Sequence, residues 1–230
     1  MKSKRPRPPF VCSLTKRETI FGICFLPVYV FVLPLLIGML TEYWPTELPA
    51  AKVNTVYCLI GFLFILLCLR KHLRADWDRL CDNKLAMLIT LIATHLLSIV
   101  LSMLIVLVSI ALFDDSTNPY DAQGVKTGMG NMFTALVLLS PIVEEVLFRG
   151  VLFGALRKKN RAAAYIVSIL AYVIASVWQL TDLSFEMQLF CALQAIPAAF
   201  ALCWSYERSG CIWVPILYHA LTNLSAGALL

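Results

Sequence analysis

The chain has 230 residues and a formal net charge of +5, and 60% of its residues are hydrophobic whereas only 14% are charged. Soluble domains carry roughly 25% charged residues, so most of this chain cannot face water. Its apolar stretches run unbroken for about twenty residues, which favours spanning α-helices over the alternating ~10-residue strands of a membrane barrel. The composition therefore predicts an all-α, polytopic integral membrane protein.

About seven apolar segments are candidate transmembrane helices, because about twenty helical residues cross the ~30 Å hydrocarbon layer. They follow a basic arm at residues 1–18 and divide into N-terminal helices at 19–128 and core helices at 129–230, within one membrane domain. The third segment is too long for one upright crossing, so it tilts, extends beyond the bilayer or contains a break. The segments lie at residues 19–40, 53–69, 85–113, 129–156, 162–180, 185–206 and 211–229.

The basic residues predict the orientation of these segments. All of the 19 lysines and arginines except Lys52, Lys126 and Arg149 fall on one side of the arrangement. By the positive-inside rule, the N-terminus is cytoplasmic and the C-terminus external. The net charge of +5 then reflects orientation and contact with anionic lipid headgroups. We expect the lipid bilayer as a partner and no nucleic acid.

The fourth segment places two carboxylates and a guanidinium at membrane depth, where charges are costly and typical of functional sites. Glu145 and Arg149 are four residues apart, so they share one helix face and are predicted to pair. Glu144 points about 100° away and needs another helix, water or a proton. A cluster that only joins helices is the structural alternative. The stretch reads Pro141-Ile142-Val143-Glu144-Glu145-Val146-Leu147-Phe148-Arg149-Gly150.

The last segment supplies a second polar pair. His219 and Asn223 lie four residues apart, shortly after Pro215, and should both face the bundle. Imidazole and carboxamide groups can donate hydrogen bonds to a developing oxyanion, although hydrogen bonding between helices is an equally ordinary use. Of the other histidines, His72 is predicted to be solvated in a basic loop. His95 is predicted to be packed and hydrogen-bonded, with a site role as the alternative.

The pattern Glu144-Glu145-x-x-x-Arg149, followed by His219-x-x-x-Asn223, resembles the CAAX-protease and bacteriocin-processing (CPBP) family of intramembrane glutamate endopeptidases. The resemblance covers about residues 129–230, so this part is expected to be the catalytic core. It implies that Glu144 activates the attacking water, that Glu145 and Arg149 organise the site, and that His219 and Asn223 stabilise the oxyanion. It implies no cofactor and no metal, and one histidine beside glutamates offers too few ligands for zinc.

The middle motif of that family departs from its pattern here. The family has an aromatic residue followed four positions later by histidine, and the corresponding stretch, Ala175-Ser176-Val177-Trp178-Gln179, has Gln179 in place of the histidine. A glutamine can hold a water molecule but cannot take its proton. Three outcomes follow for Glu144: it works with a weaker partner, it works slowly, or hydrolysis has been lost.

The resemblance implies a metal-independent endopeptidase that cleaves membrane-associated peptides or proteins. The family matures prenylated proteins in eukaryotes and serves bacteriocin immunity, peptide processing or membrane-protein cleavage in bacteria, and the compact chain favours a bacterial cell membrane. Gln179 favours one alternative, a weak or inactive member acting as an immunity, binding or scaffold protein. The other alternative is a proton-coupled transporter with Glu144 or Glu145 as the carrier.

Overall fold

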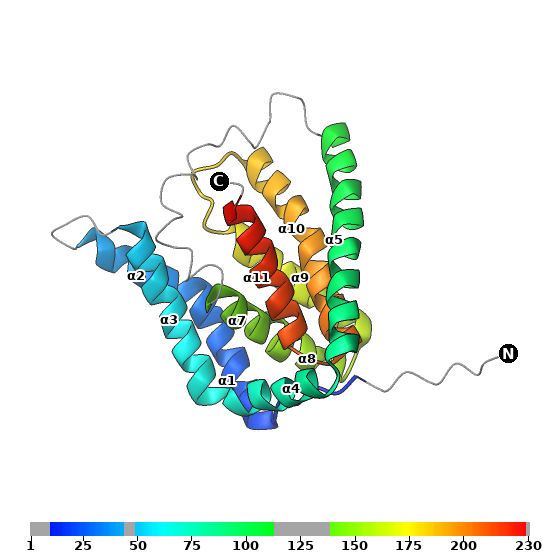
Figure 1. Cartoon of the computed structure of the whole chain (residues 1–230). Helices are drawn as coiled ribbons and strands as arrows, with labels where there is room; N and C mark the ends of the chain where they lie inside the picture. Colours follow the sequence, from blue (N-terminus) through cyan, green and yellow to red (C-terminus); the bar gives the residue numbers. More distant parts are fainter. Residues whose placement is uncertain (1–9, 44–48, 113–138, 229–230) are drawn as a thin grey trace.

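The computed structural model describes residues 10–43, 49–112 and 139–228, and all regular structure in these ranges is helical, as predicted (Figure 1). The N-terminal half forms one long helix, a bent helix pair and a second long helix. The C-terminal half forms a central charged helix and three helices around it. The elements are α1 (Lys16–Pro27), η1 (Val28–Val32), α2 (Leu33–Glu42), α3 (Ala50–Cys68), α4 (Arg70–Asp82), α5 (Lys84–Leu112), α7 (Ser140–Glu145), η5 (Val146–Phe153), α8 (Gly154–Arg157), α9 (Arg161–Val177), α10 (Phe185–Ser209) and α11 (Trp213–Ala228).

Three helices of the described chain are long and apolar enough to cross a membrane, namely Lys16–Glu42, Lys84–Ile110 and Phe185–Ser209. A fourth span arises if α3 and α4, which are bent by 83° at Leu69, count as one. The predicted count of seven is therefore not confirmed. At 17 residues, α9 is about 25 Å long and falls short of the ~30 Å hydrocarbon layer. Residues 113–138, which include the start of the predicted fourth span, lie outside the described residues.

The third predicted span is one continuous helix, because α5 runs without interruption for 29 residues. The alternative that this span contains a break is therefore wrong. Tilt and extension beyond the bilayer are the two remaining explanations for its length. Along α5, leucine and isoleucine side chains such as Leu88, Ile92 and Leu107 are exposed on the surface of the bundle. An exposed apolar face of this length suits lipid and not water.

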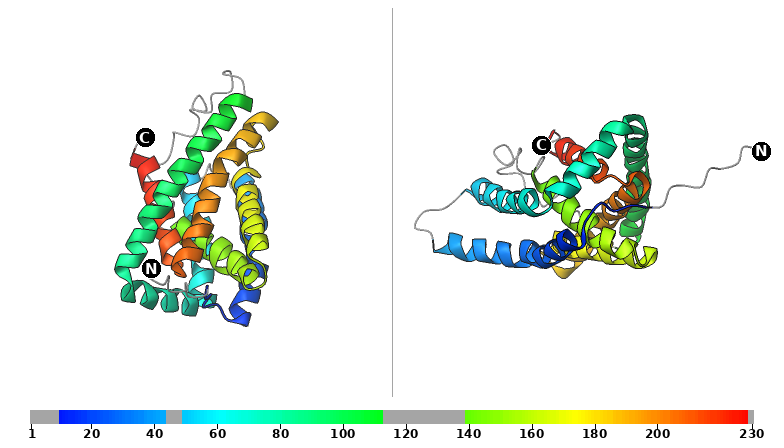
Figure 2. Two further views of the ribbon diagram at one scale, coloured as in Figure 1. Left: turned by 90° about the vertical axis from the view of Figure 1, so that its right-hand side faces the viewer. Right: turned by 90° about the horizontal axis from the view of Figure 1, so that it is seen from below.

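The predicted second loop is instead a helix. Residues 70–82 form α4, which lies across the lower ends of α3 and α5 (Figures 1 and 2). Its buried side chains His72, Leu73 and Asp76 follow helical spacing and face the bundle, while Arg70, Lys71 and Arg74 are exposed. The loop assignment is therefore wrong, because polar composition concealed an amphipathic helix.

Both predictions for the remaining histidines are wrong. His72 is fully buried: its Nδ1 lies 2.5 Å from the Ser13 hydroxyl, and that hydroxyl also lies 2.8 Å from Asp76. His95 is exposed on the outer face of α5, where its ring lies 6.1 Å from that of Tyr218. A histidine is buried when it lies on the helix face that packs against the bundle. The composition of the surrounding stretch does not show which face that is.

A charged helix lies at the centre of the bundle. It consists of α7, η5 and α8 in direct succession and contacts α1, α3, α9, α10 and α11. Figure 1 shows α11 crossing in front of it and α9 behind. Almost every residue from Ser140 to Gly154 is buried. Its charges are therefore surrounded by protein and not by lipid, which is the arrangement that makes charge at membrane depth tolerable.

The first span is interrupted at Tyr29. Pro27 lies at the end of α1, and the next turn, Val28–Val32, widens into a π-helix before α2 begins. Tyr29 and Val30 are the buried residues of this turn. Single π-turns inside helices are frequent at functional sites. This one turns Tyr29 into the core beside the charged helix.

Candidate active site

The two adjacent glutamates point into different surroundings. Both lie at the end of α7, and the helical turn of about 100° per residue separates their side chains. Glu145 is fully buried and faces Arg149 and His219, whereas Glu144 is partly buried and lines a cavity. Two carboxylates of one helix are therefore placed for two different tasks.

Glu145 is held by two cationic or hydrogen-bonding partners. Arg149 Nη1 lies 3.1 Å from Glu145 Oε1, so the predicted ion pair along the helix is present. His219 Nδ1, from a helix 74 residues further along the chain, lies 2.8 Å from the same oxygen. A carboxylate only accepts hydrogen bonds, so Nδ1 carries the proton of this contact. Glu145 is thus a fixed link between the charged helix and α11.

Arg149 is fully buried and its charge has several partners. Besides Glu145, its Nη2 lies 3.4 Å from the carbonyl oxygen of Ala199 in α10. Its guanidinium also lies over the ring of Tyr172, 4.3 Å from the centroid, as in a cation–π contact. A buried charge without partners would cost several kcal/mol. These contacts make Arg149 an organising residue that joins the charged helix to α9 and α10.

The wider turns of η5 position this cluster. Arg149 lies within the π-helix Val146–Phe153, and Ser168 of α9 donates a 3.0 Å hydrogen bond to the carbonyl oxygen of Phe148. A π-turn shifts side chains from their ordinary helical positions and leaves carbonyl groups open to such partners. The motif therefore lies on a distorted helix that α9 holds in place.

Glu144 lines a cavity of about 170 Å³ bounded by η1, α3, the charged helix and α9. Ser140, one turn earlier on its own helix, donates a hydrogen bond to Glu144 Oε1. The other lining residues are mainly aromatic and apolar, and Glu144 is their one ionisable carboxylate. The lining comprises Tyr29, Val30, Tyr57, Glu144, Phe148, Tyr172, Ala175, Ser176, Trp178 and Gln179.

Two hydrogen-bond donors in this lining lack a partner among the described residues. The Tyr29 hydroxyl and the Trp178 indole nitrogen are both buried atoms without a hydrogen bond, and Tyr29 as a whole is only 2% exposed. Buried donors are nearly always paired. Sequence reasoning missed both residues. The one available signal for Tyr29 was Pro27, which precedes the wide turn that buries it.

Comparison with known proteins agrees with this geometry. The sequence model of the family described as "Type II CAAX prenyl endopeptidase Rce1-like" matches residues 128–225, the part that contains the charged helix and α11. The match covers less than half of the chain, and this part is similar to the type II CAAX prenyl endopeptidase family. The resemblance seen in the glutamate motif is thereby confirmed at the level of the family.

One relative of known sequence supports the same assignment. The "Putative membrane peptidase YdiL" of Bacillus subtilis (strain 168) is 31% identical over 86 residues, which is 37% of this chain and 32% of the relative. The match thus spans about a third of the relative's length. No solved structure matches the chain. Together with the apolar helices, the relative indicates an integral membrane protein.

Gln179, the residue at the expected position of the CAAX endopeptidase middle histidine, lines the Glu144 cavity. It does not lie on a helix, however, because α9 ends at Val177 and Gln179 falls in the following turn, where it is exposed. Gln179 also lines a second opening, of about 270 Å³, between α2 and α3, so it lies between this opening and the Glu144 cavity. The assignment of Gln179 to the middle motif stays a prediction.

A second pair with the spacing of the middle motif lies on α9 itself. Tyr172 and Ser176 are four residues apart, and both line the Glu144 cavity. Tyr172 packs on Arg149, and the Ser176 hydroxyl lies 2.8 Å from the carbonyl oxygen of Tyr172. Ser176 is therefore a second candidate for the position that carries histidine in the CAAX endopeptidases. The sequence pattern had indicated only Gln179 for this position.

The predicted oxyanion pair is only partly brought to the cavity. His219 is buried on α11 and joined to Glu145, one residue from Glu144, and its ring lies 6.4 Å from that of Tyr172. Asn223 lies one turn further along α11 and is half-buried. Neither residue is among those that line the 170 Å³ cavity. His219 thus adjoins the cavity through the glutamate pair.

No group of three or more His, Cys, Asp or Glu side chains is arranged to hold a metal ion within residues 10–43, 49–112 and 139–228. The cluster around Glu145 combines one carboxylate, one imidazole and a guanidinium. A guanidinium cannot act as a ligand and repels a cation. The prediction of a site without metal stays a prediction.

Proposed function

We propose that this protein is an intramembrane endopeptidase in which Glu144 activates a water molecule for attack on a peptide bond. The observation that carries the proposal is the different surroundings of the two glutamates. Glu145 is bound by Arg149 and His219. Glu144 instead lines a cavity whose wall also contains two donors without a partner among the described residues. The similarity of residues 128–225 to the CAAX endopeptidase family supports the same reaction class.

In the proposed reaction the Glu144 carboxylate removes a proton from water, and the oxygen attacks the substrate carbonyl carbon. The negative charge that develops on the carbonyl oxygen requires fixed donors in a water-poor site. Collapse of the tetrahedral intermediate breaks the carbon–nitrogen bond, and the protonated Glu144 returns its proton to the leaving amine. Ser140 orients Glu144 through its hydrogen bond.

The oxyanion donors follow in part from the resemblance, which assigns this role to His219 and Asn223. Because the Nδ1 proton of His219 is directed to Glu145, its Nε2 can donate only when the ring is an imidazolium. Tyr29 and Trp178 would add neutral donors from the cavity wall. Glu145 and Arg149 would hold these groups in position without contacting the substrate.

The proposed substrate is a membrane-associated peptide or protein, since the cavity lies within a bundle of apolar helices. The bacterial relative supports a place in a bacterial cell membrane. The test is hydrolysis of a panel of membrane-anchored peptides by protein reconstituted in vesicles, with products identified by mass spectrometry in ¹⁸O-labelled water. The variant Glu144→Gln should abolish cleavage, whereas Glu186→Gln, an exposed carboxylate on α10, should leave it unchanged. Equal cleavage by both variants would contradict the proposal.

The second candidate function is that of a binding or immunity protein which keeps the fold but has lost hydrolysis. It is favoured by the lack of a histidine at both positions that could carry the middle motif, Ser176 and Gln179. The variants Ser176→His and Gln179→His decide between the two. If the wild type is inactive and either variant cleaves, the binding function is supported. If the wild type cleaves, the binding function without hydrolysis is excluded. The variant that then cleaves faster identifies the position of the middle-motif histidine.

A further inference from the structure

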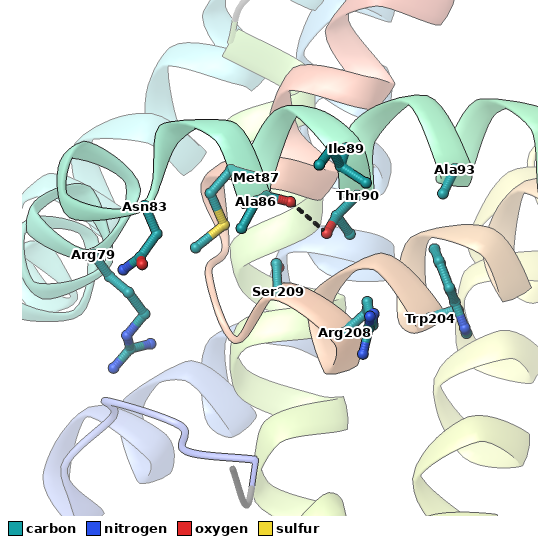
Figure 3. A pocket seen from close by; sticks show the side chains of 10 residues that line it. All are labelled: Arg79, Asn83, Ala86, Met87, Ile89, Thr90, Ala93, Trp204, Arg208 and Ser209. Carbon is teal, nitrogen blue, oxygen red and sulfur yellow. Dashed lines mark hydrogen bonds between the residues drawn. The ribbon is translucent and has the colours of Figure 1, made fainter. Parts of the chain in front are cut away.

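A second and larger cavity lies away from the glutamates, between the beginning of α5 and the end of α10. It has a volume of about 780 Å³ and shares no lining residue with the Glu144 cavity. Figure 3 shows Arg79 of α4 at one end of it, with Trp204 and Arg208 following one another along α10. We call it the α5–α10 groove. Its lining comprises Arg79, Asn83, Ala86, Met87, Ile89, Thr90, Ala93, Trp204, Arg208 and Ser209.

One part of the groove is apolar and is formed by small side chains of α5. Ala86, Thr90 and Ala93 follow helical spacing along one face of α5, opposite α10 (Figure 3). The Thr90 hydroxyl donates to the carbonyl oxygen of Ala86 at 2.8 Å, so its proton is used within the helix. These small side chains leave part of the space between the two helices unfilled, and we expect this space, the channel of the groove, to take a hydrocarbon chain.

The other part of the groove carries positive charge. Arg208 is exposed and forms no hydrogen bond or ion pair with any residue in the described parts of the chain. Arg79 pairs with Asp76 and donates to the carbonyl oxygen of Gly210, while its side chain stays 30% exposed. Among the described residues, the lining contains no acidic side chain. Two guanidinium groups, one from α4 and one from the end of α10, therefore border the groove.

This combination matches one class of ligand. Guanidinium groups bind phosphate oxygens through paired hydrogen bonds, and basic pockets between membrane helices on the cytoplasmic side take anionic lipid headgroups. Both arginines lie on the side that the charge distribution predicts to be cytoplasmic. The exposed apolar side chains of α5 beside the groove, including Leu85, Leu88 and Ile92, would continue the contact with acyl chains.

We propose that the α5–α10 groove binds an anionic glycerophospholipid, with its phosphate on the guanidinium of Arg208, within the positive potential of Arg79, and one acyl chain along Ala86, Thr90 and Ala93. Trp204, one turn before Arg208, packs beside the glycerol region, as tryptophan does at membrane interfaces. A free inorganic anion would use the arginines but not the apolar channel. The proposal does not depend on proteolysis.

The test measures binding of phosphatidylglycerol and phosphatidylcholine to the full chain in detergent by native mass spectrometry. We expect wild type to retain phosphatidylglycerol preferentially and Arg208→Gln to bind it about tenfold more weakly, as expected for loss of one charge-assisted hydrogen bond. The matched control is Arg74→Gln, an exposed arginine of α4 outside the groove, which should bind like wild type. Equal weakening by both variants would overturn the proposal in favour of general basic attraction.

Two further arms identify which part of the ligand is recognised. Ala93→Phe should fill the channel and weaken phosphatidylglycerol binding while both arginines remain. Excess inorganic phosphate should not displace the lipid, because it cannot occupy the channel. Binding that is unchanged in Ala93→Phe, or full displacement by inorganic phosphate, would mean an anion site without a lipid groove and would overturn the proposal.

Discussion

Tyr29 is the residue whose surroundings are hardest to explain by packing alone. Its ring stacks on Tyr57 at 4.5 Å, and the Tyr57 hydroxyl donates to its carbonyl oxygen at 3.0 Å. Its own hydroxyl, by contrast, is buried without a partner in the wall of the Glu144 cavity. An unpaired buried donor costs about 1–3 kcal/mol. Phenylalanine would pack in the same place without that cost, so the proposed function predicts that the hydroxyl contacts the substrate.

The variant Tyr29→Phe separates this role from a structural one. Removing an unpaired hydroxyl should leave the melting temperature unchanged or slightly raised, while kcat for peptide cleavage should fall about tenfold to a hundredfold if the hydroxyl stabilises the oxyanion. The measurements are thermal unfolding and steady-state cleavage in the same detergent. Tyr43→Phe, at a side chain that is 83% exposed, is the control. A lowered melting temperature with unchanged kcat would contradict the role.

At the scale of elements, the close approach of α3 to the charged helix sets the shape of the cavity. A Cβ atom at Gly61 would lie 2.5 Å from the Tyr29 ring and 2.7 Å from a methyl group of Val143. Val143 directly precedes Glu144, so α3, η1 and α7 meet at a point where only glycine fits. The close packing at Gly61 therefore helps to position both Tyr29, the unpaired donor, and Glu144, the proposed general base.

The substitution Gly61→Ala should destabilise the protein and lower activity together. The added methyl group has to displace Tyr29 or Val143, and overpacking of this kind costs about 1–3 kcal/mol. Gly38→Ala provides the control, since its Cβ would meet no atom within 4 Å, and alanine should stabilise that helix by up to about 1 kcal/mol. Differential scanning fluorimetry and the cleavage assay measure both effects. Similar behaviour of the two alanine variants would show that α3 has room to move.

Helix α4 attaches to the bundle through His72 and Asp76. The Ser13 hydroxyl contacts both side chains, and Asp76 also accepts a 2.8 Å hydrogen bond from the backbone amide of Ile212 at the start of α11. Gly150 of the charged helix lies directly against His72. The amphipathic helix α4 thus joins the N-terminal segment to the two helices that carry Glu144 and His219.

This attachment should weaken in mild acid. Burial is the main cause that lowers the pKa of His72. The negative charges of Asp76 and Glu18 raise this pKa and the positive charges of Arg79 and Lys158 lower it, and the net shift is downward. Below roughly pH 6.5, the ordinary value, the unfolded chain then binds a proton that the folded protein does not, so stability falls as pH decreases. The melting temperature should drop between about pH 7 and pH 5, and His72→Gln should reduce that slope. The exposed His95→Gln should retain it; an unchanged slope in His72→Gln would refute the assignment.

For the whole molecule, the distribution of charge divides the bundle into two ends. Arg157, Lys158 and Arg161 gather at the end that also carries the start of α1 and helix α4, and Glu207 binds Arg157 and Arg161 there. The turn between α9 and α10, which holds Asp182, lies at the opposite end of both helices. The positive-inside rule therefore predicts which end faces the cytoplasm.

Fusions of alkaline phosphatase in a bacterial host test this orientation, because the enzyme is active only outside the cytoplasm. A fusion after Asp182 should be active, and one after Lys159 should be inactive. The reverse pattern would place the groove and α4 on the outer side and would exclude the predicted topology. Equal activity of both fusions would require that α9, with only 17 residues, does not cross the membrane.

The helical membrane class followed from the sequence because composition and run length respond directly to the solvent around a helix. The Glu145–Arg149 pair was also predictable, since residues four apart on one helix meet whatever surrounds them. The contact of His219 with Glu145, the burial of His72 and the placing of Tyr29 beside Glu144 depended on which helices pack together. Local periodicity does not record such distant contacts, so only the tertiary structure decided which carboxylate is occupied and which faces the cavity.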